Sequence, residues 1–204
     1  MSDTEVSTRQ RLLDAAKGLF LEKGAEQVSL RAVNAAAGLN PGAVHYHFGS
    51  REGLVSALLE RELGPVWRAW WERVPGDAAS VAELVGGLVE PFAELVATRD
   101  GRVLVHLLAR TALPAGQLPN VATPFTPAPF EVRIGRALPG LTPQEVAERC
   151  ALAFSLVMYT YGRPLVRQPA ERTVFPATET VVAFVLAGLT APGAAAEPGA
   201  TRAR

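Results

Sequence analysis

The polar groups best placed for chemistry lie between Arg31 and Arg51, where His45, Tyr46 and His47 stand in a row. Imidazole can bind a metal, transfer a proton or contact a phosphate. His45 and His47 are two positions apart and so lie on different faces of a helix, which suits neither a zinc pair nor a catalytic dyad. No cysteine cluster or phosphate-cradling glycine loop accompanies them. The sequence therefore favours contact with phosphates or bases over catalysis.

Two short predicted helices hinged at Gly38 position these side chains. Ser29 is a typical N-cap, and Gly38 tolerates the positive φ that a sharp helix exit requires. A second start follows at once, with Asn40 as the cap and Pro41 at the first helical position, where its missing N–H costs nothing. Two starts this close predict a helix-turn-helix over residues 29–48.

The second of these helices has two different faces. Val44 and Phe48 lie four positions apart on one face, whereas Gly42 and Tyr46 point the opposite way. A helix of two turns is not stable alone, so we expect the apolar pair to dock on a small core supplied by an upstream helix that begins at Ser7. The free face then fits the major groove of double-stranded DNA.

From Ala37 to Leu54 the chain reads Ala-Gly-Leu-Asn-Pro-Gly-Ala-Val-His-Tyr-His-Phe-Gly-Ser-Arg-Glu-Gly-Leu. This stretch resembles the signature of the TetR family of bacterial transcriptional regulators. The resemblance covers the first quarter of the chain. It implies an all-α homodimer with two DNA-reading heads on effector-binding bodies, in most cases a repressor that leaves its operator when a small molecule binds.

The chain departs from the family pattern at three positions. His45 stands where a Tyr is common, and Gly49 stands where a Lys often touches phosphate, so we expect Arg51 to take over that contact. Asn34 occupies a place where a small Ala is usual. A larger polar group there either loosens the crossing of the two helices or forms a local hydrogen bond.

Charge does not mark the head as a DNA-binding region. Residues 1–61 contain seven Arg or Lys and seven Asp or Glu, and the net charge of the whole chain is zero. DNA affinity must therefore come from a few well-placed groups, and we expect it to fall only modestly with salt. The expected DNA-contacting residues are Ser29, Arg31, Asn40, Pro41, Gly42, Ala43, His45, Tyr46, His47 and Arg51.

The rest of the chain predicts amphipathic helices punctuated by proline. Gly64 and Pro65 fall in the helix that leaves the head, where they form either a hinge that tilts the head or an ordinary packing kink. Further helix starts are marked by the capping boxes Ser80 with Glu83 and Thr142 with Glu145.

Aromatic and cationic residues of this body are candidates for an effector pocket. Arg102, His106 and Arg110 form a row at spacing four, which is either a solvated face or a pocket wall that selects an anionic effector. Residues 114–129 hold five prolines, which predict a loop that serves as a flexible connection or as a lid. The candidate pocket residues are Trp67, Trp71, Phe92, Arg102, His106, Arg110, Phe125, Phe130 and Tyr159.

Two late helices, one starting at Pro143 and one at Pro176, are apolar on more than one side. Two such helices from each subunit can assemble a four-helix dimer interface. The residues expected there are Val146, Cys150, Val157, Val181, Val182, Val185 and Leu189. Residues 191–204 are mostly Ala, Gly and Pro and are expected to form a disordered tail.

Length and composition agree with two folded parts. We expect residues 1–49 to form the DNA-binding domain and residues 50–190 to form the ligand-binding and dimerisation domain. The single Cys150 excludes an intramolecular disulfide framework, and the acidic N-terminus lacks the features of a signal peptide. The longest apolar stretch, near residues 181–189, is too short to span a bilayer, so we expect a cytoplasmic protein without membrane contact.

Catalysis finds little support elsewhere in the sequence. His106 has no evident carboxylate or nucleophile near it in the chain, and Cys150 lies among apolar residues, which is typical of a core position. We predict no catalytic residue, no metal site and no cofactor. Two alternatives stay open: a nucleic-acid enzyme that carries a helix-turn-helix module, and a helical small-molecule-binding protein. Clustered Asp and Glu residues for magnesium would favour the enzyme, and none stand out.

Overall fold

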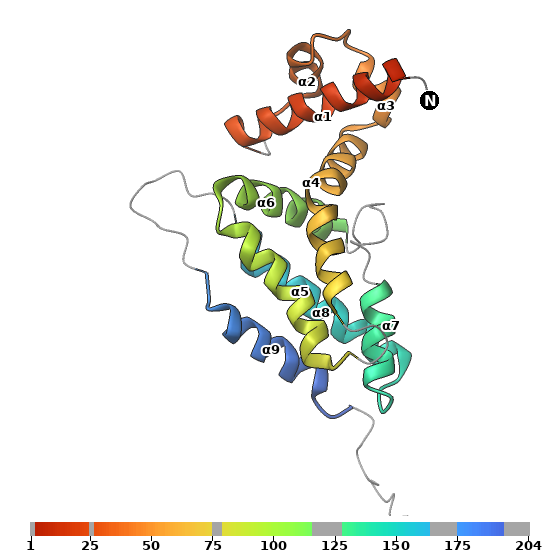
Figure 1. The fold of residues 1–204 in the computed structure, drawn as a ribbon, viewed down its shortest axis with the longest axis vertical. Helices are drawn as coiled ribbons and strands as arrows, with labels where there is room; N and C mark the ends of the chain where they lie inside the picture. The colour runs from red at the N-terminus through yellow and green to blue at the C-terminus, as the bar shows by residue number, and fades with distance from the viewer. Residues whose placement is uncertain (1–2, 25–26, 75–78, 116–127, 164–174, 194–204) are drawn as a thin grey trace, which may run out of the picture.

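The computed structural model describes residues 3–24, 27–74, 79–115, 128–163 and 175–193 of this chain. All regular secondary structure in these ranges is α-helical, which confirms the predicted all-α fold. The helices are α1 (Asp3–Lys23), α2 (Leu30–Ala36), α3 (Ala43–Phe48), α4 (Arg51–Arg73), α5 (Val81–Val96), α6 (Arg99–Ala115), α7 (Ala128–Ala137), α8 (Pro143–Tyr161) and α9 (Thr178–Thr190). Figure 1 shows α1, α2 and α3 gathered at one end as a small head, from which α4 leads into a larger body.

A core shared by the first four helices holds the head together. Its almost fully buried side chains are Leu12, Leu13, Ala16, Phe20, Val33, Val44, Leu54, Val55 and Leu58. The first helix ends at Lys23, because the next residue, Gly24, has a φ of 82° and donates its N–H to the Phe20 carbonyl at 2.9 Å. Its predicted start at Ser7 is wrong. The helix already begins at Asp3.

Helix α4 belongs to both parts of the molecule. Its start is set by Ser50, whose hydroxyl accepts the N–H of Gly53 at 3.1 Å. The helix then runs without interruption through Gly64 and Pro65, so the hinge or kink expected there does not end the helix. Pro65 lies on the exposed side and Gly64 on the buried side, and the proline ring therefore projects away from the body core.

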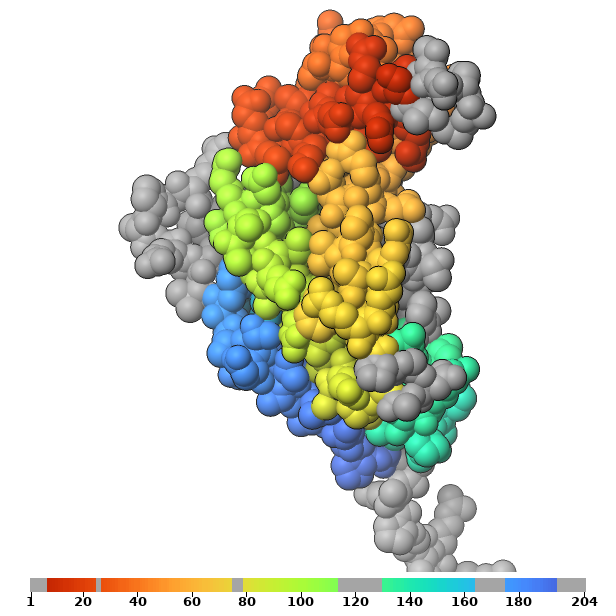
Figure 2. All heavy atoms as spheres, viewed as in Figure 1, coloured from red at the N-terminus to blue at the C-terminus, as the bar shows by residue number. Residues whose placement is uncertain are grey.

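Two ion pairs join the head to the middle of α4. Lys17 on α1 contacts Glu62 at 2.5 Å, and Arg61 contacts Asp14 on α1 at 2.8 Å. Arg61 also pairs with the neighbouring Glu62 at 2.8 Å, so the four side chains form one connected group. Helix α1 additionally contacts α6 of the body. Figure 2 shows the head seated directly against the body.

The body is a bundle in which α5 packs against α4, α6, α7, α8 and α9. Both predicted capping boxes are confirmed, with Ser80 and Glu83 starting α5 and Thr142 and Glu145 starting α8. The last helix begins at Thr178, two residues after the proline that was expected to start it. No helix in the described part of the chain is both long and apolar enough to cross a membrane.

Candidate nucleic-acid interface

The first motif helix is bounded as the sequence predicts. The Ser29 hydroxyl accepts the N–H of Ala32 at 3.2 Å, and α2 follows from Leu30. After α2, Gly38 has a φ of 64°, a left-handed conformation that a residue with a side chain adopts only with strain. Ser29 and Gly38 therefore set the two ends of this helix.

The second motif helix is shorter than predicted. It begins at Ala43 rather than at Pro41, and Asn40 does not cap it with its side chain. Residues 40–43 instead form a turn in which the N–H of Ala43 donates to the backbone carbonyl of Asn40 at 3.1 Å. Gly42 occupies the N-cap position and offers no side-chain hydrogen bond.

The missing cap is replaced by a side chain of α2. Asn34 is only 2% exposed, and its Oδ1 accepts the N–H of Val44 at 3.0 Å. Its Nδ2 donates to the carbonyl of Pro41 at 2.7 Å. Asn34 thus forms local hydrogen bonds across the motif, which decides between the two roles that the sequence left open for it.

A side chain of α1 also supports this turn. Arg11 donates from Nη2 to the carbonyl of Ala37 at 2.6 Å, at the end of α2. A side chain added to Gly38 would approach that Nη2 atom to 3.3 Å. The turn between α2 and α3 is therefore held from two directions.

The predicted two faces of α3 are confirmed. Val44 is fully buried, whereas Tyr46 is 77% exposed. The Tyr46 ring makes an edge contact with the ring of His47, with centroids 4.9 Å apart. Since α3 is docked through its apolar side, the residues on its other side are free to contact something outside the protein.

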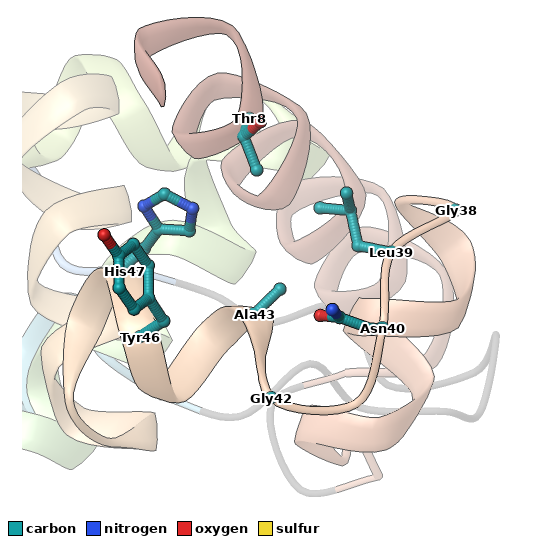
Figure 3. A pocket seen from close by; sticks show the side chains of 8 residues that line it. All are labelled: Thr8, Gly38, Leu39, Asn40, Gly42, Ala43, Tyr46 and His47. Atoms are coloured by element: carbon teal, nitrogen blue, oxygen red, sulfur yellow. The ribbon is translucent and has the colours of Figure 1, made fainter. Parts of the chain in front are cut away.

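The exposed side of α3 borders a surface hollow with a volume of about 740 Å³. Figure 3 shows this surface, with Thr8 of α1 on one side and the turn that leads into α3 on the other. It is lined by Thr8, Gly38, Leu39, Asn40, Gly42, Ala43, Tyr46 and His47. Five of the ten residues expected to contact DNA therefore line one continuous hollow: Asn40, Gly42, Ala43, Tyr46 and His47.

The other five expected DNA contacts do not line this hollow. Of these, Ser29, Arg31, Pro41 and His45 are exposed. Arg51 is half-buried, with its guanidinium carbon 5.8 Å from the ring centroid of Phe20. Arg9 lies similarly over Phe48, at 4.9 Å.

The aromatic residues that were expected to line an effector pocket differ in their burial. Trp67, Phe92 and Phe130 are buried, and the first two are packed against each other with ring centroids 4.6 Å apart. Trp71 is half-buried beside Phe130, Tyr159 is exposed, and Phe125 lies outside the described residues.

The three residues of the predicted cationic row on α6, Arg102, His106 and Arg110, have different surroundings. Arg102 donates to the carbonyl of Val96 at 3.0 Å, and Nδ1 of His106 lies 2.8 Å from the carbonyl oxygen of Gly162. These two side chains therefore bind backbone near the ends of α5 and α8. Arg110 is exposed.

Among the described residues, two buried N–H donors of the body have no hydrogen-bond partner. They are Nε1 of Trp70 and Nη1 of Arg133. The guanidinium carbon of Arg133 also lies 4.8 Å from the ring centroid of Trp71. An unpaired buried donor is costly, and neither residue forms part of a recognisable motif, so only the folded chain reveals them.

The residues expected at a dimer interface lie mostly inside the single chain. Val146, Cys150, Val157, Val181, Val185 and Leu189 are at most 5% exposed, and Val182 is partly buried. They pack in the core of the body, and Val185 and Leu189 also line the groove between α8 and α9. The apolar side chains left exposed on the same two helices are Leu152, Tyr159 and Phe184, at 71%, 68% and 69%.

The potential catalytic groups have ordinary structural surroundings. Cys150 is 1% exposed, which confirms the predicted core position, and burial together with the nearby Glu131 raises the pKa of its thiol to about 12. A protonated thiol is a poor nucleophile. Among the described residues, no three His, Cys, Asp or Glu side chains are grouped so that they could hold a metal ion.

The fold and the exposed helix define a class, the helix-turn-helix proteins with an all-helical body. Residues 12–58 match the family described as bacterial regulatory proteins, tetR family. The resemblance expected from the motif is therefore confirmed over these residues.

Relatives and solved structures agree with this assignment. The chain is similar to the transcriptional repressor AcnR of Corynebacterium efficiens, with 36% identity over 90 residues that cover 43% of this chain and 40% of AcnR. The chain spans about half the length of the curated relatives it matches.

Two solved structures extend the similarity of fold to the body. A TetR-family regulator from Streptomyces coelicolor A3 aligns with a TM-score of 0.53 at 22% identity, over 93% of this chain and 97% of that one. The multidrug binding protein EbrR, complexed with imidazole, aligns with a TM-score of 0.50 at 24% identity, over 90% of each chain.

Proposed function

We propose that this chain is a transcriptional repressor that binds operator DNA as a homodimer and leaves it when a small molecule binds the body. Residues 1–49 are the DNA-binding domain, and residues 50–190 bind the effector and the second subunit. The observation that carries the proposal is α3, which is docked through the fully buried Val44 while Tyr46 on its opposite side is 77% exposed. The AcnR relative, a repressor by name, supports the direction of regulation.

The reading surface of α3 favours shape and methyl contact over charge. The helix contains no Arg, Lys, Asn or Gln, so it lacks the side chains that usually form bidentate contacts with guanine or adenine. Tyr46 and the small residues beside it can contact thymine methyl groups. Phosphate contacts come from Arg51 at the start of α4 and from backbone N–H groups, whereas Arg31 on α2 is proposed to read a base edge.

The effector site lies in the body, by analogy with EbrR, a protein of similar fold whose structure contains imidazole. The unpaired donors Trp70 Nε1 and Arg133 Nη1 support an effector that carries hydrogen-bond acceptors. Thermal-shift screening of small molecules tests this part, because a ligand bound only by the folded state raises the unfolding temperature.

The exposed apolar face of α8 and α9 is proposed to bind a second copy of the chain. It forms a groove of about 340 Å³, whose lining includes Leu152, Leu156, Phe184 and Gly188. A two-fold interface brings such a face against itself and buries the exposed side chains of both subunits. The two heads of the dimer then read half-sites about one turn of DNA apart, roughly 34 Å.

Selection of binding sites from random duplex DNA tests the DNA-binding part. We expect an enriched sequence with two inverted half-sites, and we expect Tyr46→Ala to weaken binding to it by about tenfold, since an exposed side chain of the reading helix is lost. Glu60→Ala serves as the control because Glu60 is exposed on α4. Failure to enrich any sequence from the random pool would contradict the proposal.

A further inference from the structure

Asn34 lies beneath the reading helix and not on its DNA side. It is 2% exposed, and it is one of only two polar residues that are buried among those the structure describes. We propose that Asn34 is a positioning residue that sets the placement of α3, and that DNA sequence discrimination depends on it although it does not face the DNA. The role in discrimination rests on the proposed function, whereas the role in positioning does not.

The first step of the argument is the missing cap of α3. The first N–H groups of a helix have no partner inside the helix, and a side-chain oxygen at the N-cap usually accepts one of them. Gly42 has no side chain to do so. The N–H of Val44, two positions after Gly42, donates to Asn34 Oδ1 instead. This bond is fully buried, so water cannot replace it without entering the core.

The second step is that Asn34 binds both sides of the α3 start. Its Nδ2 group holds the carbonyl of Pro41 in the turn, while Oδ1 holds Val44 inside the helix. One rigid planar amide therefore fixes both the distance of α3 from α2 and its rotation about its own axis. Helix α3 has only six residues, so its own backbone hydrogen bonds cannot define that placement.

The third step concerns how α3 reads DNA. Without Arg or Lys, its discrimination comes from close contacts of small and aromatic side chains with base edges. Dispersion contacts weaken steeply when a gap of less than 1 Å opens. Phosphate contacts by flexible Arg side chains tolerate such a shift. A displaced α3 therefore loses discrimination before it loses general DNA affinity.

The experiment compares Asn34→Ala with Val33→Ala. Val33 is the neighbouring residue of α2 and is fully buried, so its truncation also destabilises the head but leaves the amide in place. For each variant, binding to the selected operator and to an unrelated duplex is measured at a temperature where the protein is folded. We expect Asn34→Ala to lower the ratio of specific to non-specific affinity by about tenfold, the effect of one mismatched base pair, and Val33→Ala to leave it unchanged. Equal ratios for the two variants would overturn the role in discrimination.

Asn34→Asp provides a second test. A protonated carboxyl group can accept from Val44 and donate to Pro41 as the amide does, whereas a carboxylate turns an acceptor toward the Pro41 carbonyl. We therefore expect the variant to recover the wild-type ratio as the pH is lowered. A ratio that does not respond to pH, beyond the response of the wild-type protein, would contradict the role of the two hydrogen bonds.

Hydrogen exchange of the Val44 amide, measured without DNA, tests the positioning role of Asn34 independently of the proposed function. Exchange should be faster in Asn34→Ala than in Val33→Ala, relative to other α3 amides. If the wild-type chain selects no operator, the proposed function fails, and this exchange measurement still decides whether Asn34 positions α3. Equal exchange in the two variants would refute the positioning role.

Discussion

At the residue scale, the uncharged and the cationic side chains of the proposed DNA-binding surface lie on different helices. Tyr46 and His45 are exposed on α3, while the cationic groups come from elsewhere: Arg31 on α2 and Arg51 at the start of α4. Arg31 is exposed and carries no aromatic neighbour among the cation contacts of the described residues, whereas Arg51 lies over Phe20. The two arginines are thus expected to act differently on DNA.

Arg31→Ala should reduce operator affinity by about 1–3 kcal/mol and relax the preference at one base pair, as expected for a side chain that reads a base edge. Arg51→Ala should weaken binding to all sequences alike, because a phosphate contact carries no sequence information. Repeating the selection of binding sites with each variant measures both effects. If Arg31→Ala weakens every sequence equally, Arg31 does not read a base.

At the element scale, α4 is the physical link between head and body. Its Glu62 binds Lys17 on α1, and its neighbour Arg61 binds Asp14 on the same helix. Burial acts to raise the pKa of Glu62, but hydrogen bonds from Lys17 and Arg61, together with their charges, outweigh it and lower the pKa below its ordinary value. The ionised form of Glu62 is therefore favoured in the folded protein.

A lowered pKa makes this link sensitive to acid. The contribution of Glu62 to stability is complete above its ordinary value of 4.5 and is lost as the pH falls through the lowered value in the folded state. Glu62→Gln should be less stable than the wild type near neutral pH by roughly 0.2–1 kcal/mol, and the difference should shrink in acid. Urea unfolding at a series of pH values measures it. Glu60→Gln, at an exposed position of the same helix, is the matched control, and parallel curves for the wild type and Glu62→Gln would contradict the prediction.

At the scale of the whole molecule, the head and the proposed dimer interface lie on different parts of the fold. The head sits at one end of α4, whereas α9 lies along the body, packed on α5 and α8 (Figure 1). Phe184 on α9 and Leu152 on α8 border the same groove and are largely exposed. A monomer that exposes large apolar side chains in one patch is a candidate for association.

Phe184→Glu should dissociate the dimer. Placing a carboxylate at the centre of a two-fold apolar interface sets like charges against each other and removes an aromatic anchor, so we expect the dissociation constant to rise by about 30-fold or more. Sedimentation velocity over a range of concentrations measures this. Val132→Glu, at an exposed apolar position of α7, is the control. A monomeric wild-type protein, or a dimer unaffected by Phe184→Glu, would exclude this interface.

Much of the head could be predicted from the sequence because its signals are local. Ser29 and Gly38 act within a few residues of their own positions, and each set a helix end as expected. The faces of α3 followed from a spacing of four residues, which is a property of any helix. The same holds for the capping boxes that start α5 and α8.

Only the tertiary structure decided which residues meet across helices. The start of α3 was predicted wrongly because the N–H of Val44 donates to the side chain of Asn34, ten residues before Val44. No local pattern reveals that partner. The late helices were identified, but each is apolar on several sides, so periodicity could not tell which side packs on α5 and which stays exposed. Local capping and spacing are written in consecutive residues, whereas the choice between two apolar faces depends on what the rest of the folded chain brings against them.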